Sequence, residues 1–150
     1  MAKLVDRHFG LKPDKFLSYV DRFNLSQPLG FQLVGEGKPV VKRPSDKEWS
    51  GITLPWMAYG YGLEITPLQT LSLYNAVANK GKMIRPIIVK SAKKADRVKE
   101  TYATVVLNEK ICSDETLSKV QQMLEGVVER GTAQNIKNEH YSIAGKTGTS

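Results

Sequence analysis

The residues of this sequence with the clearest chemical potential form a short polar run, Lys146-Thr147-Gly148-Thr149, within segment 144–150. The lysine supplies a fixed positive charge, and the two threonines supply hydroxyl donors. The glycine has no side chain, so a substrate can lie against the backbone. A recognition strand that pairs with an extended peptide needs this feature. The run therefore predicts a β-strand over residues 144–149, with Lys146 and Gly148 on one face and both threonines on the other.

The same residues also suggest a phosphate-binding loop, because Gly145-Lys146-Thr147 matches the end of the pattern Gly-x-x-x-x-Gly-Lys-Thr. That pattern requires a glycine five positions before Gly145, where His140 stands instead. It also requires a helix after the threonine, with its N-terminus facing the phosphate. Gly148 follows the threonine directly. We therefore exclude a phosphate-binding loop.

The net charge offers a second lead, because 22 basic and 15 acidic side chains give the chain a charge of +7. Such an excess could serve nucleic acid or another anionic polymer. The densest basic cluster, residues 90–99, is however interrupted by Asp96 and followed by Glu100, and no aromatic residue interleaves with it to stack bases. This pattern predicts a solvated linker and no nucleic-acid partner.

Other reactive side chains have structural interpretations. A Ser-x-x-Lys pattern occurs once, at residues 91–94, but it lies in the most charged linker of the chain, whereas a serine nucleophile needs a rigid, partly buried site. His8 and His140 are too few and too isolated to predict a metal site or a catalytic triad. The single cysteine, Cys112, is expected to be a small apolar filler.

The two tryptophans, Trp49 and Trp56, lie in a segment rich in glycine and proline, residues 24–60. They could line a substrate groove, but we expect them to pack beneath this long loop.

Length and pattern predict one soluble globular domain of mixed class. The 150 residues are 41% hydrophobic, and no run approaches the ~18 apolar residues of a membrane span. Helices are expected over residues 2–9 and 13–23, from a cap at Thr66 to residues 79–81, and from a cap at Ser113 to Gly131. Residues 84–89 and 102–107 are expected to form an antiparallel pair. The fold class is therefore α/β (α+β), an antiparallel sheet packed against helices.

Four segments of the chain carry a family resemblance. They are Gly-Tyr-Gly-Leu-Glu-Ile-Thr-Pro-Leu-Gln-Thr at 60–70, Asn-Ala-Val-Ala-Asn-Lys-Gly-Lys at 75–82, Gly-Val-Val-Glu-Arg-Gly-Thr-Ala at 126–133 and Ala-Gly-Lys-Thr-Gly-Thr-Ser at 144–150. In order and spacing they resemble the class B penicillin-binding proteins, in which Lys-Thr-Gly is a signature element. Residues 35–40 further resemble the cell-division (septal) branch of that family.

The resemblance implies a D,D-transpeptidase anchored in the cytoplasmic membrane, with this domain on the extracytoplasmic (periplasmic) side. In such enzymes a serine attacks the D-Ala-D-Ala bond of a peptidoglycan stem peptide, and β-lactams acylate the same serine. By position, Lys146 would supply charge around the serine and the substrate carboxylate. Thr147 and Thr149 would bind that carboxylate beside Gly148, and the Thr149 backbone N–H would serve the oxyanion. Cell-division proteins would be partners, and neither cofactor nor metal is expected.

The sequence also departs from the family pattern. Ser-x-Asn is absent, and the single Ser-x-x-Lys follows the Thr-Pro-Leu-Gln segment, whereas the family's nucleophile precedes it. We therefore expect the C-terminal part of a transpeptidase domain, residues 1–150, truncated at both ends and not catalytic alone. A strand edge exposed by truncation would favour self-association. The alternatives are a β-lactam sensor domain and a non-enzymatic module that binds an anionic polymer; sequence upstream of Met1 would discriminate the sensor from the enzyme.

Overall fold

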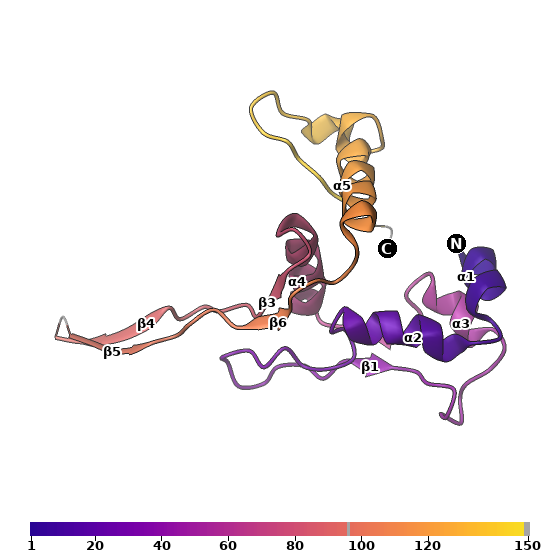
Figure 1. Ribbon diagram of the computed structural model, residues 1–150, viewed down its shortest axis with the longest axis horizontal. Helices are drawn as coiled ribbons and strands as arrows, with labels where there is room; N and C mark the ends of the chain where they lie inside the picture. Colours follow the sequence, from indigo (N-terminus) through magenta and orange to yellow (C-terminus); the bar gives the residue numbers. More distant parts are fainter. Residues whose placement is uncertain (96, 149–150) are drawn as a thin grey trace.

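The computed structural model describes residues 1–95 and 97–148 and combines helices with short antiparallel strands (Figure 1). The helices are α1 Ala2–Phe9, α2 Pro13–Arg22, α3 Thr53–Met57, α4 Pro67–Ala78 and α5 Asp114–Glu129, with the 3-10 turn η1 Gln134–Ile136. The strands are β1 Val40–Val41, β2 Leu63–Glu64, β3 Met83–Ile84, β4 Ser91–Lys94, β5 Arg97–Thr101 and β6 Val106–Asn108. In the described residues, no helix is both long and apolar enough to cross a membrane.

The N-terminal helices pack around one apolar cluster. Its buried members are Leu17 of α2 and Leu54 and Met57 of α3. Phe9 of α1 lies edge-on to Phe16 of α2, with the ring centroids 5.6 Å apart, a favourable geometry for two aromatic rings. The antiparallel ladder β1–β2 closes this cluster, because Val41 and Leu63 pair in register and both pack against it.

A second apolar cluster joins α4 to the central strands. Ala76, Met83 and Ile111 are buried there, and Leu107 and Cys112 pack against them. The expectation that Cys112 fills apolar space is therefore confirmed. The ladder β3–β6 passes through this cluster with a register irregularity between Met83 and Ile84.

Helix α4 begins where the sequence predicts it, at the Thr66-Pro67 pair. The Thr66 hydroxyl accepts from the Gln69 backbone N–H at 3.2 Å, and the Gln69 side chain accepts from the Thr66 N–H at 2.9 Å, which completes a capping box. The helix ends at Ala78 with Asn79 as its C-cap, and Gly81 follows with a φ of +84°, a conformation that favours glycine. Helix α5 likewise starts at its predicted cap, since Ser113 accepts from the Thr116 N–H.

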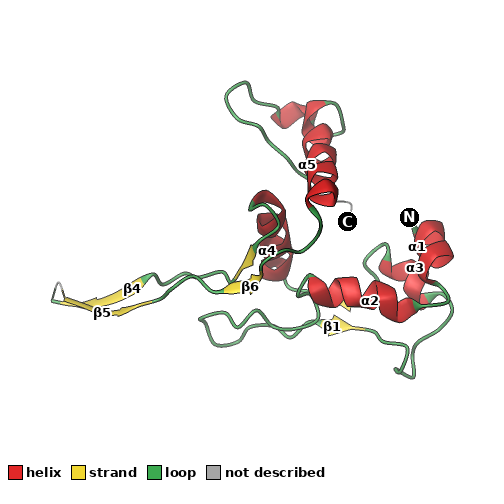
Figure 2. Cartoon of the chain, viewed as in Figure 1, coloured by secondary structure: helices red, strands yellow, loops and turns green. Residues whose placement is uncertain are grey.

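The segment before α3 is mainly loop, as predicted (Figure 2). Polar contacts hold it in place. The Glu36 carboxylate accepts hydrogen bonds from three successive backbone N–H groups, those of Leu29, Gly30 and Phe31, at 2.6–2.9 Å. The Gln32 side chain bonds to the backbone of Ile88 and Val89. These contacts replace the regular ladder that prolines and glycines prevent. Within residues 24–60 the prediction missed the short elements β1 and α3.

The strand prediction needs a correction at residues 90–100. The charged segment expected to be a linker is a β-hairpin, in which β4 pairs with β5 and projects from the rest of the molecule (Figure 1). Pairing between 84–89 and 102–107 is limited to the short β3–β6 ladder. Charged side chains suit an exposed two-stranded arm, because both of its faces are in water. Helices with antiparallel strands agree with the predicted class, and the described strands form three separate two-stranded ladders.

Candidate functional site

The predicted recognition segment lies against the first half of α4. A hollow there is lined by Pro67, Thr70, Leu71 and Tyr74 of α4 and by residues 144–148. Because α4 turns once every 3.6 residues, its positions 67, 70, 71 and 74 fall on one face. The capping box at Thr66 fixes where α4 begins, and this determines which residues of the helix face Lys146.

Residues 144–148 are neither helix nor strand, so the predicted β-strand is not formed over the described part of that segment. Thr149 and Ser150 lie outside the described residues. A strand needs a neighbouring backbone to complete its ladder. Among the described residues, the backbone contact that holds this segment is Gly145 N–H to the Leu124 carbonyl, at 3.1 Å. The strand prediction failed here because local residue types cannot supply a pairing partner.

Helix α5 also contacts this segment and is joined to α4. Its Gln121 side chain donates to the Val77 carbonyl at 2.8 Å and so joins α5 to α4. A second hollow between the two helices is lined by Tyr74, Leu124 and Ala144, among others. The segment therefore leaves α5 at Gly145 and reaches the face of α4 by Lys146.

The groups of the recognition segment are accessible to a ligand. Lys146 and Thr147 are exposed, and the lysine ammonium donates to the Thr147 carbonyl. In the described chain, no carboxylate forms an ion pair with Lys146. A Cβ built on Gly145 or Gly148 would meet no atom within 4 Å. The space beside both glycines is open, which leaves the lysine charge and the bare backbone available to an anionic, extended ligand.

The other reactive residues do not join this site. Ser91 lies on β4, where it pairs with Thr101, and Lys94 pairs with Arg97 at the far end of the same strand. Residues three apart on a strand point to opposite faces, so this serine and lysine cannot work together as they would on a helix. His8 lies on α1 beside Phe9, and the backbone N–H of His140 donates to the Asn138 side chain in a turn.

The tryptophans differ from each other. Trp49 packs against the Leu17 cluster, as expected. Trp56 is 49% exposed, and it lines a separate pocket with Tyr61, so the expectation that it packs under the loop is wrong. The pocket rim also carries the ion pair Lys42–Glu48, at 2.8 Å. Their hydrogen bond lowers the pKa of Glu48 and raises the pKa of Lys42, so both stay charged near neutrality.

Sequence reasoning also missed the part that α4 plays at the site. Leu71 is 62% exposed, and both Leu71 and Tyr74 line the hollow beside Lys146. The available signal was their helical spacing, because Leu71 lies four residues after Pro67 and Tyr74 lies four residues after Thr70. A buried stripe and a site-facing stripe have the same periodicity, so the pattern alone could not separate them.

A comparison with known families decides the affiliation. The model of the penicillin-binding protein transpeptidase domain matches residues 3–150. The chain belongs to this family. The match contains the four resembling segments, including Lys146 and Gly148.

Individual relatives agree with this assignment. Penicillin-binding protein PbpB of Mycobacterium tuberculosis is 34% identical over 146 residues, which cover 91% of this chain and 21% of that protein. Peptidoglycan D,D-transpeptidase FtsI of Escherichia coli K12 is 31% identical over 129 residues, covering 85% of this chain and 20% of that protein. The predicted resemblance to septal class B penicillin-binding proteins is thereby confirmed. The chain spans about a fifth of the length of these relatives.

A solved structure gives the same result. Penicillin-binding protein 3 of Mycobacterium tuberculosis, complexed with ampicillin, superimposes with a TM-score of 0.64 at 30% identity, covering 79% of this chain and 25% of that one. The mixed fold therefore corresponds to part of a penicillin-binding protein transpeptidase domain.

Proposed function

We propose that this chain is the C-terminal part of the transpeptidase domain of a peptidoglycan D,D-transpeptidase. The observation that carries the proposal is the family match over residues 3–150, which includes the Lys-Thr-Gly segment in an open hollow against α4. The names of relatives such as FtsI supply the reaction class, and the ampicillin complex of a similar structure supports β-lactam binding.

The chemistry of the proposed reaction divides between this chain and the rest of the protein. A serine from the remainder of the domain attacks the carbonyl carbon of the D-Ala-D-Ala peptide bond. That bond breaks, D-Ala leaves with a proton on its new amine, and an ester joins the peptide to the serine. The amine of a neighbouring stem peptide then attacks the ester, forms the cross-link and returns a proton to the serine.

Within this scheme the described residues bind and orient the substrate. Lys146 has no acidic partner among the residues described, so its charge is available to the terminal carboxylate of the stem peptide. The Thr147 hydroxyl adds a donor, and the open space at Gly148 admits the peptide backbone. For Thr149 we propose carboxylate binding and an oxyanion contact, the latter worth about 3–4 kcal/mol to the transition state.

The setting of the whole protein is part of the same proposal. The parent is a membrane-anchored enzyme with this domain on the extracytoplasmic side, and its partners are cell-division proteins. The resemblance of residues 35–40 to the septal branch supports this role.

Labelled penicillin tests the function in the full-length parent. We expect Lys146→Ala to reduce the rate of acylation by about 100-fold or more, since it removes a charge-assisted contact at the reacting site. Lys93→Ala in the exposed hairpin β4–β5 is the matched control and should leave the rate unchanged. Equal acylation of both variants would contradict the role of Lys146. Rapid acylation without turnover of a stem peptide would instead favour the β-lactam sensor.

A further inference from the structure

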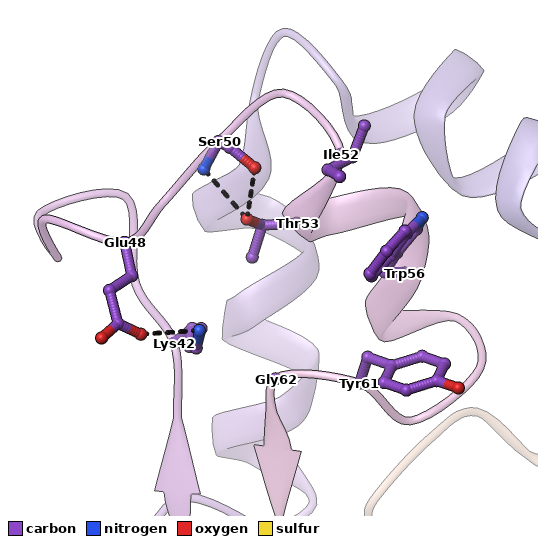
Figure 3. A pocket seen from close by; sticks show the side chains of 8 residues that line it. All are labelled: Lys42, Glu48, Ser50, Ile52, Thr53, Trp56, Tyr61 and Gly62. Atoms are coloured by element: carbon purple, nitrogen blue, oxygen red, sulfur yellow. Dashed lines mark hydrogen bonds and ion pairs between the residues drawn. The ribbon is translucent and has the colours of Figure 1, made fainter.

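A pocket distant in the sequence from the Lys-Thr-Gly segment has the features of a second binding site. It has a volume of about 270 Å³ and lies between the loop after β1 and helix α3 (Figure 3). Ligand pockets in proteins span about 300–1,000 Å³, so this one suits a single ring with its substituents. Its floor is Gly62, whose carbonyl accepts from the Lys42 N–H at 3.0 Å, so the ladder β1–β2 fixes the base.

One wall of this pocket is aromatic. Trp56 and Tyr61 stand with ring centroids 5.5 Å apart and planes tilted by 50°, and 49% and 65% of their respective surfaces are exposed. Two large rings left half in water form a rigid apolar surface with polar tips. Ile52 adds a small exposed aliphatic surface to the same pocket.

The other wall is polar. Ser50 and Thr53 place their hydroxyl oxygens 3.2 Å apart, and the Ser50 N–H donates to the Thr53 hydroxyl. Glu48 uses one carboxylate oxygen toward Lys42, which leaves the other oxygen free to accept. In Figure 3 these groups lie across the pocket from the two rings. The pocket thus has an apolar aromatic wall on one side and hydrogen-bond donors and acceptors on the other.

From this arrangement we infer that the pocket formed by Lys42, Glu48, Ser50, Thr53, Trp56 and Tyr61 binds a saccharide ring carrying an N-acetyl group. A pyranose has an apolar C–H face for the aromatic wall and equatorial hydroxyls for the polar wall. An acetamido substituent fits the remaining features. In this proposal its N–H would donate to the second carboxylate oxygen of Glu48, and its carbonyl would accept from Lys42 or Ser50.

The saccharide class follows from the pocket itself, whereas the choice of an N-acetylated glycan strand as the natural ligand rests on the proposed function. In that setting the pocket would hold the glycan of the peptidoglycan whose stem peptide enters beside Lys146. The contact would anchor the polymer at a second point and raise the effective concentration of the peptide at the first.

Calorimetric titration of the 150-residue chain with the β-1,4-linked tetramer of N-acetylglucosamine tests the inference. We expect saturable binding that Trp56→Ala weakens about tenfold or more and that Trp56→Phe weakens less, because a smaller ring keeps part of the aromatic wall. Tyr59→Ala is the matched control. Tyr59 follows α3 and is 66% exposed, but it does not line the pocket, so binding should be unchanged.

Two outcomes would overturn the inference. One is the absence of saturable binding at millimolar tetramer, and the other is binding that Trp56→Ala leaves unchanged while circular dichroism shows the variant folded. Cellotetraose, which lacks the acetamido groups, should bind more weakly, and equal binding would refute the recognition of N-acetyl groups. Failure of the penicillin test in the full-length parent would leave these titrations unaffected, so the two proposals fail separately.

Discussion

At the scale of single residues, chemistry depends on where a side chain lies rather than on the motif it matches. Lys146 lies in an open hollow beside α4, whereas Lys94 lies on an exposed hairpin. Both belong to motifs of the same protein family, Lys-Thr-Gly and Ser-x-x-Lys. The structure separates the two lysines, because Lys146 lines a hollow with residues of α4, whereas Lys94 is exposed on the hairpin.

Ser91 provides the first prediction at this scale. We expect the 150-residue chain to form no covalent adduct with labelled penicillin, because Ser91 and Lys94 lie on opposite faces of β4. Lys93 shares the face of Ser91 but is exposed, whereas a base that activates a serine must be desolvated. Intact-mass measurement after incubation would test this, with the full-length parent as the positive control. An adduct mapped to Ser91 would contradict the assignment.

The ion pair between Asp21 and Arg43 gives a prediction about pH. The Arg43 guanidinium donates to both oxygens of Asp21, at 2.5 and 3.1 Å, and this hydrogen bonding holds the pKa of Asp21 below its ordinary value against an opposing effect of burial. A carboxyl whose pKa is lowered by folding stabilises the fold above its unfolded pKa, about 3.9, and loses that contribution as the pH falls through the folded pKa.

We therefore expect Asp21→Asn to lower the free energy of unfolding by about 0.5–1 kcal/mol at pH 7, a small value because both side chains are partly exposed. The difference from the parent chain should shrink progressively below about pH 4. Urea unfolding at pH 7 and pH 3 measures it, and Glu139→Gln in an exposed loop serves as control. An undiminished difference at pH 3 would show that the loss does not come from the ion pair.

At the scale of elements, the sequence predicts what is local and fails at what needs a partner. The caps of α4 and α5 were predicted because Thr66, Pro67 and Ser113 act on their own first turns. The β4–β5 hairpin was missed because its strands are charged on both faces and lack the alternation of a half-buried strand. At the site, Lys146 was found from its motif, but its α4 neighbours and the Trp56 pocket arise from packing between segments distant in sequence.

Gln69 shows how one side chain links elements. It is 1% exposed, it completes the capping box of α4, and its amide nitrogen donates to the Gln27 carbonyl at 3.0 Å and lies near the Leu25 carbonyl at 3.4 Å. We expect Gln69→Ala to destabilise the chain by about 2–3 kcal/mol, because it leaves buried carbonyls without donors and removes part of the cap. Thermal and urea unfolding measure the loss. Gln122→Ala, on the exposed face of α5, should change stability by less than about 0.5 kcal/mol, and equal losses would contradict this role.

At the scale of the whole molecule, the described chain consists of two apolar clusters with a projecting hairpin rather than one enclosed core. Several large apolar side chains are in water, among them Leu71 at the proposed peptide site and Met123 on α5. The backbone of residues 144–148 has few partners in the described structure. Exposed apolar surface and an unpaired extended backbone both favour association with another chain.

The last prediction follows from these surfaces. We expect the 150-residue chain to self-associate at micromolar concentration, with residues 144–148 pairing between copies, because a second backbone would supply the ladder that they lack. Sedimentation velocity measures the association. Thr147→Pro should weaken it, since proline removes an N–H donor from the pairing edge and resists incorporation in a ladder. Thr132→Pro, in the loop after α5, is the matched control and should leave the association intact. A monodisperse monomer in the unsubstituted chain would refute the prediction. It would mean that the contacts of residues 144–148 with α4 and α5 suffice for this segment without a second copy.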